Sequence, residues 1–148
     1  ELIEHILQTH HRPLEEELLR LETMLKKVHQ VHHKKNPEVL DQLLNVYLDM
    51  KQELLQHMHK EEVILFPLIK AGRGLEADCP IALMRQEHDS AGSSLQKIRE
   101  LTDNFTVPEG ACNTWRALWH GLENLEKDLH QHIHLENNIF FPRALNGE

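Results

Sequence analysis

Two stretches of the sequence, QHMHKEEVILFP and QHIHLENNIFFP, lie 75 residues apart and are identical at seven of twelve positions. In both copies a histidine precedes a glutamate by four residues, as His57 with Glu61 and His132 with Glu136. On a helix this spacing places both side chains on one face. Imidazole nitrogens beside carboxylate oxygens suit a borderline cation such as iron, manganese or zinc. The pairs therefore indicate a metal site in a chain built from two similar halves.

Four helices are predicted to position these pairs. Prolines and glycines divide the chain into segments of roughly 1–34, 37–70, 80–103 and 109–141. Pro13 lies inside the first segment, where it removes one backbone hydrogen bond, so we expect a kink there. Leu and Glu dominate the composition, and aromatic residues make up only 5%. The predicted fold class is all-α: an antiparallel up-down-up-down four-helix bundle with a pseudo-twofold internal repeat.

Each segment has one seam of core positions, found by stepping three and four residues in alternation, as in helices that pack side by side. The seams of the second and fourth segments contain the two His/Glu pairs at the same depth. The third seam passes through His88 and the first through His11. The other expected core members are Ile3, Leu7, Leu14, Leu18, Leu21, Leu25, Val28, Leu40, Leu43, Tyr47, Met50, Leu54, Ile64, Leu68, Ile81, Met84, Ala91, Leu95, Ile98, Trp115, Leu118, Leu122, Leu125, Leu129 and Ile139.

In the first segment His10 competes with His11, because both fit the leucines on either side. The leucine run downstream favours His11. The two halves are then alike, since His11 precedes His57 by 46 residues. In the second half, His88 precedes His132 by 44 residues. Two such hairpins, related by a pseudo-twofold axis, would bring four histidines and two glutamates together.

A single seam histidine is more often a hydrogen-bonded core residue than a ligand. Six polar residues at matched depth differ, because burying each without a partner costs on the order of 2 kcal/mol or more. A metal removes that cost, whereas a metal-free network of His/Glu hydrogen bonds is the alternative that stays open. The other histidines are expected on the surface or rim, namely His5, His29, His32, His33, His59, His120, His130 and His134.

Several other residues lie close to these positions in the sequence. Glu53 and Glu87 either orient imidazoles and line an access path or are solvated surface acids. The Phe-Pro steps at 66–67 and 141–142 are expected to close the end of the bundle. Cys79 and Cys112 form no CxxC motif, and we expect two small buried residues rather than a disulfide or ligands.

The length, net charge and hydropathy of the chain limit which partners it can bind. Its 148 residues suit one domain, and the formal charge of −8 argues against nucleic acid and anionic membranes as partners. No apolar run approaches the ~20 residues that a membrane span needs. We expect a soluble cytoplasmic protein. The chain starts at Glu1, so the expectation is one domain over residues 1–148 or the C-terminal part of a longer protein.

Four histidines and two glutamates suit two ions better than one, since six donors around one ion leave no position open. Each ion would take two imidazole nitrogens and one oxygen from each of two bridging glutamates. An oxo or hydroxo bridge would add a fifth donor, leaving one position for dioxygen, nitric oxide or peroxide. Iron is predicted, because imidazole and carboxylate with an open position are typical of redox-active non-haem iron.

These residues carry a resemblance to a known family. The HxxxE pairs followed by FP, the early HH and the EHD at residues 87–89 resemble the haemerythrin-like HHE cation-binding domains. MHKEEVILFPLIKAG, QEHDSAG, ACNTWRAL and HLENNIFFPRAL are most similar to the bacterial di-iron proteins for repair of iron centres, over essentially the whole chain. The family pattern implies terminal ligands at His11, His57, His88 and His132 and bridges at Glu61 and Glu136.

The resemblance implies a protein of the nitrosative and oxidative stress response. It would repair damaged iron–sulfur clusters of client proteins by donating iron, or react with nitric oxide at the di-iron centre. Family members usually carry a short N-terminal cysteine-containing domain, which nothing in this sequence matches. The alternative is a non-catalytic binder, carrier or sensor of dioxygen or nitric oxide, or an iron store. Whether the protein is an enzyme stays open.

Overall fold

The computed structural model describes residues 2–147, and helix is the sole regular structure in that part of the chain. Glu1, where the first helix was expected to begin, lies outside the described residues. The elements in chain order are α1 Leu2–Ile6, η1 Leu7–His11, α2 Arg12–His32, α3 Pro37–Lys60, η2 Glu61–Leu65, α4 Phe66–Lys70, η3 Gly74–Glu76, α5 Asp78–Leu101, α6 Asn113–Leu135, η4 Glu136–Phe140 and α7 Phe141–Leu145. Three of these, η1, η2 and η4, are π-helical turns inside longer continuous helices. The helical rods are α1–η1–α2, α3–η2–α4, α5 and α6–η4–α7 in chain order.

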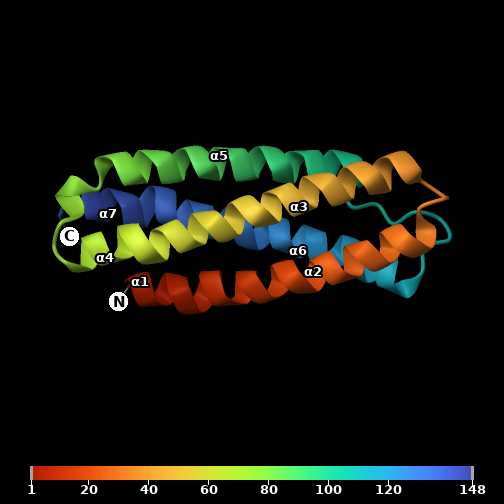
Figure 1. Cartoon of the computed structure of the whole chain (residues 1–148), viewed down its shortest axis with the longest axis horizontal. Coiled ribbons are helices and arrows are strands. Elements are labelled where there is room, and N and C mark those ends of the chain that lie inside the picture. The colour runs from red at the N-terminus through yellow and green to blue at the C-terminus, as the bar shows by residue number, and fades with distance from the viewer. Residues whose placement is uncertain (1, 148) are drawn as a thin grey trace.

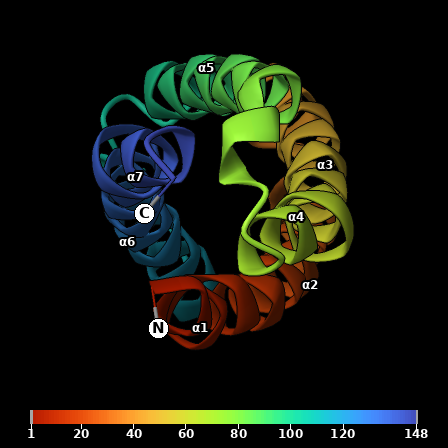
Figure 2. The same ribbon diagram turned by 90° about the vertical axis from the view of Figure 1, so that its left-hand side faces the viewer.

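The rods run antiparallel to their chain neighbours, side by side (Figure 1). Viewed from one end they form a ring in the order α2, α3, α5, α6 (Figure 2), and α3 packs on both α2 and α5 while α6 packs on α2. Both termini lie at one end, and the α2–α3 connection lies at the other (Figure 1). The predicted up-down-up-down four-helix bundle is therefore confirmed.

The core along most of the bundle follows the predicted seams. The seam leucines Leu14, Leu18, Leu21 and Leu25 are buried as expected, and so are the seam positions of α5 from Ile81 to Ile98. Tyr47 is fully buried, and its hydroxyl donates a hydrogen bond to the Leu18 carbonyl oxygen at 2.7 Å. Partnering that hydroxyl removes the main cost of placing a tyrosine in a core.

The three π turns each end just before an X-Pro step. In η1 the N–H of Arg12 bonds to the Leu7 carbonyl, five residues back, and Pro13 follows. The turns η2 and η4 repeat the pattern ahead of Pro67 and Pro142. Proline has no N–H and its ring clashes with the carbonyl four residues earlier, and a widened turn relieves that clash. Where we expected a kink at Pro13, the structure has a π turn.

Each π turn inserts one residue, which shifts the core positions beyond it. Ile64 and Ile139 were expected in the core, but they are 55% and 40% exposed. Phe66 and Phe141 are buried in their place, with 2% and 0% of their surface exposed. Leu7 and Leu68 are likewise only partly buried, and Ile6 is buried. The core positions predicted here by steps of three and four residues are wrong, because those steps assume an unbroken α-helix.

Two further expectations are corrected in the connections. The last helix begins at Asn113 rather than near residue 109, because Gly110 adopts a φ of +80° in the preceding turn. Cys79 and Cys112 were expected to be buried, but both are exposed and free. Cys79 is the second residue of α5, and Cys112 directly precedes α6. Across residues 2–147, no helix is long and apolar enough to cross a membrane.

Candidate metal centre

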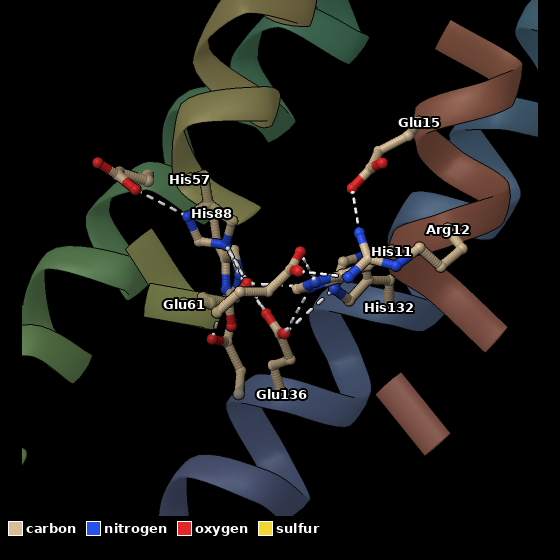
Figure 3. A network of polar contacts seen from close by, with 11 residues as sticks. His11, Arg12, Glu15, His57, Glu61, His88, His132 and Glu136 are labelled. Carbon is tan, nitrogen blue, oxygen red and sulfur yellow. Dashed lines mark hydrogen bonds and ion pairs between the residues drawn. The ribbon is translucent and has the colours of Figure 1, made fainter. Parts of the chain in front are cut away.

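Six polar side chains converge in the middle of the bundle, one or two from each rod (Figure 3). All six are buried, and the two carboxyl groups are fully inaccessible to solvent. They are the six residues selected from the sequence: His11, His57, Glu61, His88, His132 and Glu136. His11 ends η1, while Glu61 and Glu136 begin η2 and η4, so each of these three stands at a π turn.

Glu136 faces two pairs of histidines with its two oxygens. Its Oε1 lies 2.8 Å from Nε2 of His88 and 3.8 Å from Nε2 of His57. Its Oε2 lies 3.1 Å from Nε2 of His132 and 3.9 Å from Nε2 of His11. The histidines therefore pair across the bundle, one pair on each side of this carboxylate.

Glu61 lies between one histidine of each pair. Its Oε1 is 3.3 Å from Nε2 of His11 and 3.0 Å from Nε2 of His57. These contacts are close, yet neither oxygen of Glu61 has a hydrogen-bond partner among the described residues. The same holds for Nε2 of His11 and Oε1 of Glu136.

Unpaired buried polar atoms cost roughly 1–3 kcal/mol each. Here they form two groups with donor atoms within 4.8 Å of one another: His11 with Glu61, His132 and Glu136, and His57 with His88 and Glu136. Inward-facing imidazole nitrogens and carboxylate oxygens are donors for iron, zinc or manganese. The residues present thus fit a metal, which would use the lone pairs that hydrogen bonding leaves free.

In the metal-free chain, protons on the buried histidines partly balance the negative charge of the two carboxylates. Burial lowers the pKa of His11 and of His57, but Glu136 and Glu61 outweigh it and raise these values to about 9 and about 10. Burial and the nearby Glu136 charge raise the pKa of Glu61. Burial acts on Glu136 in the same direction, but His132, His11 and His57 outweigh it and lower its pKa well below the usual value.

The outward nitrogens of three histidines are held by a second set of side chains. Nδ1 of His11 lies 3.1 Å from Glu62, which also accepts a hydrogen bond from Arg12 at 2.6 Å. Nδ1 of His57 lies 2.7 Å from Glu87, which pairs with Lys60. Such partners fix the ring orientation and tautomer and leave Nε2 free to coordinate.

The third partner is Asn137, whose Oδ1 lies 2.8 Å from Nδ1 of His88. His132 differs from the others, since no residue of 2–147 forms a hydrogen bond with its Nδ1. His10 instead stacks on the His132 ring at 4.9 Å. The structure thus places His11, and not His10, in the cluster, and His10 beside it.

Two surface cavities border the cluster, one lined by α3 and α5 and the other by η1, α2 and α6. One of about 290 Å³ is lined by His57, Glu53 and Glu87. The other, of about 260 Å³, is lined by His132 and His10. Glu87 therefore both orients a ring and lines a cavity, whereas Glu53 lines the cavity and accepts a hydrogen bond from Ser90 at 3.2 Å.

The sequence did not predict the residues that hold the outward Nδ1 atoms of His11 and His88. Glu62 and Asn137 occupy equivalent positions in the two copies, so the repeat itself could have pointed to them. Phe66 and Phe141, expected to close the bundle end, stack instead on His11 and His88 at 5.6 and 5.8 Å. The widened π turns bring these rings inward.

Comparison with known proteins identifies the family of the chain. The family model of the hemerythrin HHE cation binding domain matches residues 2–144. The chain belongs to the hemerythrin HHE cation-binding domain family. Its relatives include the iron-sulfur cluster repair protein YtfE of Yersinia pseudotuberculosis serotype IB (strain PB1/+), 49% identical over 149 residues that cover 99% of this chain and 66% of the relative.

Other relatives of this hemerythrin-family chain carry the same name. YtfE of Musicola paradisiaca (strain Ech703) is 49% identical over 150 residues, covering all of this chain and 66% of the relative. YtfE of Pectobacterium atrosepticum is 48% identical over 148 residues with the same coverage. The chain thus spans 66% of the length of these relatives. Similarity to repair proteins, inferred from the sequence, is confirmed.

Proposed function

We propose that this chain is a di-iron protein of the nitrosative and oxidative stress response that repairs damaged iron–sulfur clusters. It would act by donating iron, by reacting with nitric oxide at the di-iron centre, or by both. The observation that carries the proposal is the buried convergence of four imidazoles and two carboxylates, in which Nε2 of His11, both oxygens of Glu61 and Oε1 of Glu136 lack hydrogen-bond partners. Relatives named for iron–sulfur cluster repair support the physiological role.

In this proposal each residue has a defined task. His11 and His132 hold one iron, His57 and His88 hold the other, and Glu61 and Glu136 lie between the two. Two iron ions joined by an oxo or hydroxo bridge would supply redox chemistry and open positions for nitric oxide, dioxygen or peroxide.

The surrounding residues would hold and serve that centre. Glu62, Glu87 and Asn137 fix the imidazole rings through Nδ1. The cavities beside His57 and His132 give small diatomic molecules a path inward. The clients would be iron–sulfur proteins of the cytoplasm, and one domain over residues 1–148 would contain the whole centre.

Two measurements test the proposal. Metal analysis should find two iron ions per chain, and the oxidised protein should absorb in the near ultraviolet from a bridged ferric pair. A preparation that loads only zinc, or a single metal per chain, would contradict the di-iron centre. The second measurement adds the iron-loaded protein to an enzyme with a damaged iron–sulfur cluster and follows recovery of its activity.

A matched pair of variants makes the second measurement specific. His132→Ala removes a proposed ligand, while His134→Ala removes an exposed histidine of the same rod. Recovery should be lost with His132→Ala and retained with His134→Ala. Equal recovery with both would show that the site does not carry repair. Stable reversible oxygenation without iron transfer would favour the carrier or store.

A further inference from the structure

A second group of metal donors lies where α2 meets α3, at the end of the bundle opposite the two termini (Figure 1). It consists of His29 and His33, four residues apart, together with Asp41 from the first turns of α3. His29 lies 18 residues after His11 on one rod, which corresponds to about 27 Å along a helix. The group is therefore separate from the buried centre.

The three side chains already converge on one point. Nε2 of His29 lies 2.7 Å from Oδ1 of Asp41, and Nε2 of His33 lies 3.0 Å from the same oxygen. The two rings are 4.7 Å apart between centroids. Donors bound to one ion at metal distances of about 2.0–2.2 Å lie about 3 Å from each other. An ion would thus need only small shifts of these side chains.

The surroundings also suit a cation. Near the C-terminal end of a helix the unpaired carbonyl groups favour positive charge; His29 lies in the last turn of α2 and His33 directly follows its last residue. Hydrogen bonds from His29 and His33 lower the pKa of Asp41, which keeps its carboxylate ionised. The side chains are 27%, 41% and 52% exposed, so an ion can reach them directly from solution.

We propose that His29, His33 and Asp41 form a second, exchangeable site for a divalent first-row transition ion, such as zinc. Two histidines one helical turn apart with a carboxylate from another element are the donors of open, three-ligand zinc sites. Three protein donors leave room for a water molecule or for a ligand from a partner. This site differs from the buried centre in its exposure and in having one carboxylate.

The neighbouring His32 provides a matched control. Its Nε2 lies 3.2 Å from Sγ of Cys112, so it belongs to the same helix end but not to the proposed donor group. Iron-loaded protein is dialysed against increasing zinc, and bound zinc and iron are both measured. The unsubstituted protein should bind one zinc ion per chain with saturation, without loss of iron.

The variants then assign the ion. His33→Ala and Asp41→Asn should each weaken zinc binding by about 100-fold or more, because loss of a hydrogen-bonding partner of a ligand alone costs about 10–100-fold. His32→Ala should leave zinc binding unchanged, and iron content should be equal in all variants. Absence of saturable zinc binding, or equal binding by Asp41→Asn, would overturn the proposal. Equal weakening by His32→Ala would do so as well, by moving the ion to His32 and Cys112.

Discussion

Glu136 presents its two oxygens to different pairs of histidines, and this division links the halves of the site. Glu61 lies between His11 and His57 through a single oxygen. Both carboxyl groups have no access to solvent, so water cannot stabilise their charge. Two buried carboxylates are costly in a metal-free core, and a cation bound by both of them would offset that cost.

The proposed bridging role predicts the effect of Glu61→Leu. Leucine fills the buried volume but removes a donor that two ions would share, so iron content and metal–metal coupling should fall together. The metal-free variant should be less stable than the parent protein by up to about 3–5 kcal/mol, because His11 and His57 lose one of the two buried carboxylates that compensate their charge. Iron analysis, magnetic measurements and urea unfolding check this. Two coupled irons in the variant would refute the bridge.

The second prediction concerns the adjacent histidines of η1. His11→Ala should lower iron occupancy strongly, since its Nε2 faces both carboxylates. His10→Ala should leave occupancy nearly intact, because His10 only stacks on His132. Iron content after identical loading is the measurement. A stronger effect of His10→Ala would mean that the first rod is turned by one residue.

At the scale of elements, the π turns decide which residues surround the donors. Each turn adds one residue ahead of a proline, so that Glu61 and Phe66, five apart, both face the interior. Glu136 and Phe141 repeat this arrangement. The aromatic rings then stack on His11 and His88 and exclude water from one side of the cluster.

The shifted register predicts opposite results for two neighbouring positions. Phe66→Ala should destabilise the protein by about 3–5 kcal/mol, as expected for a buried aromatic side chain. Ile64→Ala should change the free energy of unfolding by at most about 0.5 kcal/mol, because Ile64 is 55% exposed. Urea unfolding of both variants measures the difference. A larger cost for Ile64→Ala would restore the unbroken α-helical register.

For the whole molecule, a metal at the centre would be part of the folded state. An ion that binds only the folded chain stabilises it by about 2.7 kcal/mol at a concentration 100 times its dissociation constant. In a chain of this size, 1 kcal/mol corresponds to a shift of about 2–4 °C in melting temperature. In this proposal the bundle would unfold together with release of its ions.

Removal of iron is accordingly predicted to lower the melting temperature by about 5–11 °C. Calorimetry of iron-loaded and chelator-treated protein measures the shift, and addition of ferrous iron should reverse it. The Glu61→Leu variant is the control, since it should respond weakly to the chelator. Equal melting temperatures with and without iron would contradict a metal at the core.

The metal-free molecule should also lose stability in alkali. The pKa values of His11 and His57 are raised to about 9 and about 10, above the 6.5 of an ordinary histidine. The folded state therefore favours their protonated forms, a stabilisation that is complete below pH about 6.5 and is lost as the pH rises through about 9–10. Urea unfolding from pH 7 to 10 should show this decline without iron and a flatter profile with iron. Parallel profiles would contradict it.

Much of this protein was already determined by its sequence. The repeat placed His57 and His132 four residues before Glu61 and Glu136, and helical periodicity placed His88 on the third seam. Leucine spacing also favoured His11. Local rules were enough here, because helical geometry converts spacing along the chain into a shared face. The all-α bundle followed from the same periodicity.

Only the tertiary structure decided how these donors pair and what holds them. His11 lies with His132, and His57 with His88, because the ring of rods places first beside fourth and second beside third. The π turn in the second rod exposes Ile64 and buries Phe66. A widened turn changes which residues face the core, whereas the sequence prediction assumed a constant number of residues per turn. The group of His29, His33 and Asp41 exists because a short connection folds α3 back beside α2, and spacing along one helix cannot report such a contact between two.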